Sequence, residues 1–67
     1  MSSWSVRLTR KGRYEYGETG LPDEQMATAV YERLVEKARI DGGSVELLLD
    51  GQVVASFSHE PGGKAGG

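Results

Sequence analysis

One long amphipathic stretch, residues 22–40, limits the possible folds of this chain more than any other feature. Its apolar side chains recur about every 3.6 residues, which places them on one face of a helix. Pro22 and Asp23 are typical of a helix start, with Asp23 as the N-cap, and Gly42 is typical of a helix end. The sequence therefore predicts one helix of roughly 27 Å. Its buried face is expected to carry Ala27, Val30, Tyr31, Leu34 and Ala38.

Strand patterns flank this helix on both sides. Residues 4–9 alternate apolar and polar side chains, and residues 13–17 form a second β-rich run after a turn that contains Gly12. Residues 44–58 contain two further β-rich runs around Asp50-Gly51, a pair that favours a type I′ hairpin turn. We therefore predict a small α+β domain of order β-β-α-β-β, with a four-stranded, mostly antiparallel sheet and the helix packed on one face. Strand order 2-1-3-4 keeps all neighbours antiparallel.

The first turn leaves two registers open. A two-residue loop at residues 11–12 would place Tyr14 and Tyr16 beside Arg7, on the face away from the helix. A three-residue loop at residues 10–12 would instead gather both tyrosines with the core, and would leave Arg7 on the outside. The pattern of apolar side chains favours the three-residue loop.

Length and composition restrict the chain further. At 67 residues it is long enough for one domain, expected at residues 1–59, and the glycine-rich residues 60–67 are expected to form a disordered tail. The absence of cysteine excludes disulfides, and a single histidine cannot complete a zinc site. No apolar run reaches the roughly 18 residues of a membrane span, so we expect a cytoplasmic protein without membrane contact. A domain this small, without disulfides or a structural metal, must rely on unusually good packing or on association with a second subunit.

The last two strands carry more apolar side chains than one helix can cover. Pairing about Asp50-Gly51 predicts that four of them share the face opposite the helix: Leu48, Val53, Ala55 and Phe57. An exposed apolar patch of this kind favours an interface, most simply a two-fold homodimer formed by stacking or edge pairing of sheets. The alternatives are that the first hairpin covers the patch, or that the register of the second hairpin differs by one residue.

No catalytic or ligand-binding signature is present. His59 stands at a strand end without a nucleophile or an orienting group, and Asp23-Glu24 belongs to the helix start. The glycine pairs lack the strand and lysine context of a phosphate-binding loop. We therefore expect no enzyme, no cofactor, no metal and no small-molecule substrate. The preferred function is a small protein-interaction module, such as an adaptor, inhibitor or subunit, that self-associates.

The basic first hairpin supports an alternative. Although the formal net charge is −2, residues 1–16 carry about +3, from four basic residues against Glu15. These residues, together with Trp4, Tyr14 and Tyr16, would form a platform for nucleic acid if the aromatic rings were exposed. The same surface would also suit an acidic protein partner. The basic residues concerned are Arg7, Arg10, Lys11 and Arg13.

Overall fold

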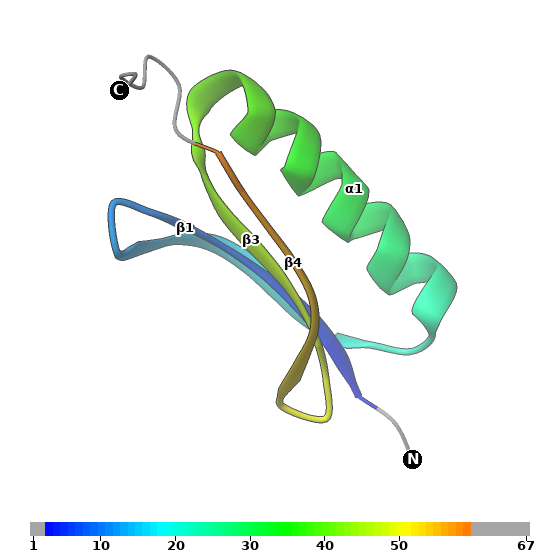
Figure 1. Cartoon of the computed structure of the whole chain (residues 1–67). Coiled ribbons are helices and arrows are strands. Elements are labelled where there is room, and N and C mark those ends of the chain that lie inside the picture. The colour runs from blue at the N-terminus through cyan, green and yellow to red at the C-terminus, as the bar shows by residue number, and fades with distance from the viewer. Residues whose placement is uncertain (1–2, 60–67) are drawn as a thin grey trace.

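Two antiparallel hairpins are joined by one helix in the computed structural model, which describes residues 3–59 (Figure 1). The elements are β1 (Trp4–Arg10), β2 (Arg13–Leu21), α1 (Glu24–Asp41), β3 (Gly43–Leu49) and β4 (Gln52–His59). The predicted α+β class and the order β-β-α-β-β are confirmed. The predicted disordered tail at residues 60–67 lies outside the described residues.

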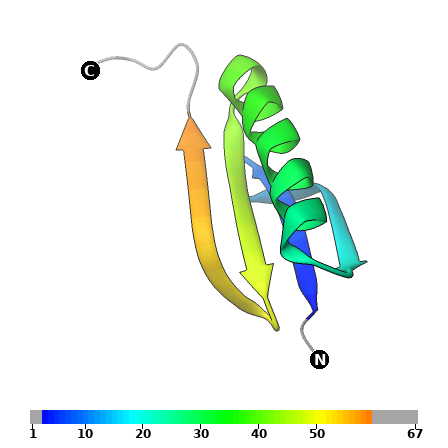
Figure 2. The ribbon, with the colours of Figure 1, turned by 90° about the vertical axis from the view of Figure 1, so that its right-hand side faces the viewer.

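The four strands form a single antiparallel sheet in the order β2-β1-β3-β4, which confirms the predicted strand order. Figure 2 shows that α1 lies on one side of this sheet. The helix packs chiefly on the two central strands, β3 and β1. The edge strands β2 and β4 are therefore covered less than the centre.

The core lies between α1 and the central strands. Val6 and Leu8 of β1 and Val45 of β3 are fully buried, because their side chains alternate toward the helix. On the helix, Ala27 and Ala38 have no exposed surface, which allows α1 to lie close to the sheet. The remaining buried core side chains are Leu21, Leu34 and Leu47.

Both ends of α1 are closed by local hydrogen bonds. The Oδ1 atom of Asp23 accepts a hydrogen bond from the backbone N–H of Met26 at 2.9 Å, which confirms Asp23 as the N-cap. At the other end, Gly42 has φ of +88° and donates its N–H to the carbonyl of Ala38 at 2.6 Å. Glycine reaches this conformation at little cost.

The first hairpin differs from the favoured prediction. Lys11 and Gly12 have φ of +55° and +76° and form a two-residue turn, so the predicted three-residue loop is wrong. The pairing then shifts by one residue: Thr9 pairs with Tyr14, whereas Leu8 pairs with Tyr16. The extra residue between the tyrosines is a β-bulge, and it turns them to opposite faces of the sheet. Neither predicted register placed them in this way.

The second hairpin contains a similar shift. The predicted type I′ turn is confirmed, since Asp50 and Gly51 have φ of +53° and +86°. Leu48 pairs with Val53, but Leu47, the preceding residue of β3, pairs with Ala55, so Val54 is an extra, bulged residue. The predicted common face for Leu48, Val53, Ala55 and Phe57 is therefore wrong, because the bulge rotates Ala55 and Phe57 toward α1.

Candidate functional site

The face of the sheet opposite α1 is mainly polar. At its centre, Arg7 of β1 and Glu46 of β3 form an ion pair through Nε and Oε1. The register surrounds this pair with hydroxyl side chains, namely Ser5, Thr9, Ser44, Ser56 and Ser58. Leu48 and Val53 are the apolar members of this face on β3 and β4, and Leu48 is buried. The open face is therefore not a continuous apolar surface.

The residues of the predicted interface are divided between the two faces. Ala55 and Phe57 pack against the core, and the guanidinium carbon of Arg39 lies 5.9 Å from the centroid of the Phe57 ring. Phe57 is only half-buried, because β4 lies beyond the strands that α1 chiefly covers. On the opposite face, Val53 is 47% exposed. Val53 and Phe57 therefore lie on opposite faces of β4, the last strand of the sheet.

The two edges of the sheet differ in their protection against pairing with other chains. β2 carries Arg13, Glu15 and Glu18, and irregularities interrupt its pairing with β1 at two points. β4 contains no Asp, Glu, Lys, Arg or Pro, and its irregularity at Val54 leaves residues 55–59 regular. Charges, prolines and bulges are the means by which edge strands avoid adding another strand. The second half of β4 is therefore the open edge of the sheet.

The hydrogen-bond pattern shows which backbone groups face outward at this edge. Asp50 donates its N–H to the carbonyl of Ser3 at 2.8 Å. Because backbone groups alternate in direction along an antiparallel strand, even-numbered residues of β3 face β1 and odd-numbered ones face β4. The odd-numbered residues pair on β4 with Ala55, Phe57 and His59. Ser56 and Ser58 therefore direct their N–H and C=O groups away from β3, at the outer side of the last strand in the sheet.

Sequence reasoning missed Ser56 and Ser58. A signal for them exists, because residues 55–58 alternate between apolar and hydroxyl side chains in a strand without charges. The adjacent valines at 53 and 54 break this alternation, and such a break is the mark of the bulge.

The basic residues of the first hairpin are partly neutralised by partners. Arg7 is held in the ion pair with Glu46, and the Nη1 atom of Arg10 lies 3.5 Å from Oε2 of Glu15. Lys11 and Arg13 are exposed at the tip of the hairpin. Two cations of the predicted basic surface are thus paired with carboxylates.

The two tyrosines of this hairpin have different surroundings. Tyr14 is 68% exposed on the open face, where its ring lies against the Cα of Gly17. Tyr16, on the helix side, donates its hydroxyl to Oε2 of Glu18 at 2.7 Å. This hydrogen bond, and the negative charge of the same carboxylate, raise the pKa of Tyr16 above its ordinary value. The predicted platform with both rings on one face is not formed.

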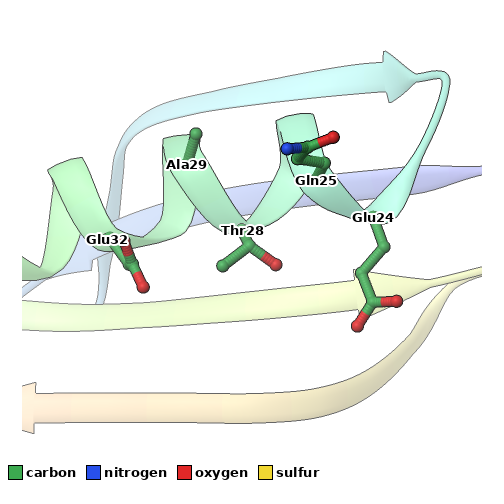
Figure 3. A pocket seen from close by; sticks show the side chains of 5 residues that line it. All are labelled: Glu24, Gln25, Thr28, Ala29 and Glu32. Carbon is green, nitrogen blue, oxygen red and sulfur yellow. The ribbon is translucent and has the colours of Figure 1, made fainter.

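A shallow depression lies on the surface of α1 (Figure 3). Glu24, Thr28 and Glu32 extend to the same side of the helix, and Gln25 and Ala29 complete the lining. All five residues come from one helix, so no second element forms an opposing wall. Small-molecule sites are normally concave and enclose most of the ligand, which this surface does not do.

The described residues contain neither a cluster of metal ligands nor a membrane-spanning helix. Within residues 3–59, no group of three or more His, Asp or Glu side chains is placed to hold a metal ion. Over the same range, no helix has the length and apolar character needed to cross a membrane. His59 is exposed at the end of β4.

Comparison with known proteins does not assign this chain to a family. No family model matches it, and neither the search of curated proteins nor that of solved structures found a match. Its function must therefore be inferred from its own residues.

Proposed function

We propose that this chain is a small, non-enzymatic protein-interaction module that self-associates through the edge of β4. The observation that carries the proposal is the outward direction of the Ser56 and Ser58 backbone groups in a strand without charges. An edge of this kind is a template for adding a further strand. We also propose that it acts in the cytoplasm, because the cytoplasm is a compartment in which proteins rarely depend on disulfides, and this chain has no cysteine to form one.

A second copy of the chain is the partner that fits this edge best. The β4 strand itself carries no Asp, Glu, Lys or Arg side chain, and an antiparallel strand can pair with its own copy about a two-fold axis. Val53 and Phe57, which remain partly exposed on the two sides of β4, would lose further surface to water in this arrangement. The expected interface of Leu48, Val53, Ala55 and Phe57 is thereby replaced by an edge contact.

The expected dimer is weak and reversible. Pairing of one short strand with another buries less than the roughly 1,200 Å² of a standard specific interface. A dimer of this size is expected to dissociate on dilution, and the same edge would then be free for a strand from another protein. Such behaviour suits an adaptor, an inhibitor or a subunit, whose partner changes with concentration.

Proline at position 56 tests the edge contact. The N–H of Ser56 points away from β3, so Ser56→Pro removes an outward donor without removing a hydrogen bond between β3 and β4. We expect sedimentation equilibrium to show concentration-dependent dimers for the unchanged chain, up to about 1 mM. The Ser56→Pro variant is expected to remain monomeric, with an unchanged circular dichroism spectrum.

Lysine at position 44 is the matched control. Ser44 lies on β3, on the open face, and its backbone is not at the sheet edge. Ser44→Lys is expected to leave edge pairing intact, whereas it would disrupt a dimer formed by stacking of the two open faces. A dimer that is lost in Ser44→Lys and kept in Ser56→Pro would contradict the edge contact.

Nucleic-acid binding by the first hairpin has less support. Arg7 and Arg10 are paired with carboxylates, and Tyr16 lies on the helix side of the sheet. Lys11, Arg13 and Tyr14 would therefore carry much of the contact. A surface with few free cations neutralises few phosphates, so its binding to nucleic acid is weak even at low ionic strength and depends only modestly on salt. Salt-dependent binding of single-stranded oligonucleotides at low ionic strength would favour this function over the edge contact.

A further inference from the structure

We propose that the dimer has its two-fold axis at Phe57, with residues 55–59 of the two copies paired antiparallel. This inference rests on the proposed self-association and adds the register of the contact. It follows from the position of the bulge, the direction of the backbone groups and the exposure of Phe57.

The bulge limits which part of β4 can pair with a second copy. Val54 is the extra residue, and a bulge bends its strand and increases the local twist. Residues 52–54 therefore present a distorted edge, whereas residues 55–59 follow a regular register opposite β3. The middle residue of this regular segment is Phe57. A symmetric contact that uses all of the segment must have its axis there.

The backbone directions agree with this axis. Outward-facing residues of one strand must meet outward-facing residues of the other, because within residues 3–59 these are the ones whose N–H and C=O groups point away from β3 at the edge. Antiparallel pairing about Phe57 places Ser56 opposite Ser58 of the second copy, and Ser58 opposite Ser56. Each of these pairs can exchange two backbone hydrogen bonds.

The side chain at the axis supplies an apolar contact. Phe57 would face Phe57 of the second copy in a non-hydrogen-bonded pair, the type in which cross-strand side chains approach most closely. Phe57 is half-buried in the single chain, with Arg39 above its ring on the α1 side and β3 on the inner side. Phe57 lies on the last strand of the sheet, so no further strand covers its outer side among the described residues. The axis would bring the two outer sides together, and aromatic rings pair favourably in this way.

Cysteine cross-linking can measure this register, because the chain has no cysteine of its own. Ser56 and Ser58 are exposed on the open face, so Ser56→Cys and Ser58→Cys leave the core unchanged. Directly paired residues have Cα atoms about 5.5 Å apart, which suits a disulfide, whereas diagonal positions are beyond its reach. The two variants would be incubated alone and as an equal mixture in a thiol–disulfide buffer.

The expected result is a cross-linked band at twice the monomer mass in the mixture, containing one copy of each variant. Each variant alone should give little of this band, and Ser44→Cys, one strand away from the edge, should give none. Strong cross-linking of Ser56→Cys alone would place the axis at Ser56 and overturn the inference, while leaving the edge dimer in place. Absence of dimers at every concentration in sedimentation, together with absence of cross-links, would contradict the proposed function itself.

Discussion

At the scale of single residues, charged side chains in the sheet are used mainly for contacts within the chain. Arg7 pairs with Glu46 across two central strands, and Glu18 accepts a hydrogen bond from Tyr16 along β2. Such exposed contacts contribute little to stability individually. Their effect is to fix the positions of these side chains.

The contact between Tyr16 and Glu18 predicts a change in titration. Glu18 raises the pKa of Tyr16 in two ways: its carboxylate accepts a hydrogen bond from the neutral phenol, and its negative charge repels the phenolate. A raised pKa means that the contact stabilises the fold below the unfolded-state value near 10, and that this contribution is lost as the pH rises through the folded-state value. Glu18→Gln is expected to lower the pKa of Tyr16, as measured by NMR titration of the tyrosine ring carbons. Glu15→Gln is the control, and an equal pKa in both variants would contradict this assignment.

At the scale of elements, α1 is the part of the chain most fully determined by local sequence. The helix was expected at residues 22–40 and runs from Glu24 to Asp41, with its predicted N-cap in place. Its buried alanines and Leu34 fall on the predicted face, because a period of 3.6 residues over five turns leaves little freedom in the choice of face.

The cap gives a prediction for this element. Asp23→Ala removes the acceptor for the Met26 N–H and is expected to lower the free energy of unfolding by about 1 kcal/mol. Urea denaturation followed by circular dichroism measures the change. Asp23→Asn keeps a capping oxygen and should stay close to the unchanged chain. If the alanine and asparagine variants were equally stable, the hydrogen bond would not be what stabilises the helix start.

The strands were predicted less completely than the helix. Their number, direction and turns followed from alternation and from Asp50-Gly51, but the faces of Tyr16, Ala55 and Phe57 did not. A single bulged residue moves every following side chain to the other face, and it depends on how the strand pairs with its neighbours as well as on its own sequence. The adjacent valines at 53 and 54 were a local sign of this shift, whereas Glu15 has no such sign.

At the scale of the whole molecule, the strand order determines which edge is open. The order β2-β1-β3-β4 places β2, with its charged side chains and irregular pairing, and the uncharged second half of β4 at opposite edges of the sheet. The antiparallel pairing of neighbours made this order predictable. The candidate site could not be predicted from the sequence. To locate the open edge at Ser56 and Ser58, both the strand order of the sheet and the register of β4 must be known. A surface defined by backbone groups leaves little trace in side-chain patterns.

Hydrogen exchange of the Ser56 and Ser58 amides tests the self-association of this edge most directly. Ala55 and Phe57 bond to β3 and should be protected at every concentration, which makes them internal controls. We predict that the amides of Ser56 and Ser58 exchange rapidly in dilute solution and become protected as the concentration approaches about 1 mM, where even a weak dimer is populated. Rapid exchange of both serine amides at all concentrations, with Ala55 and Phe57 protected throughout, would contradict pairing through β4.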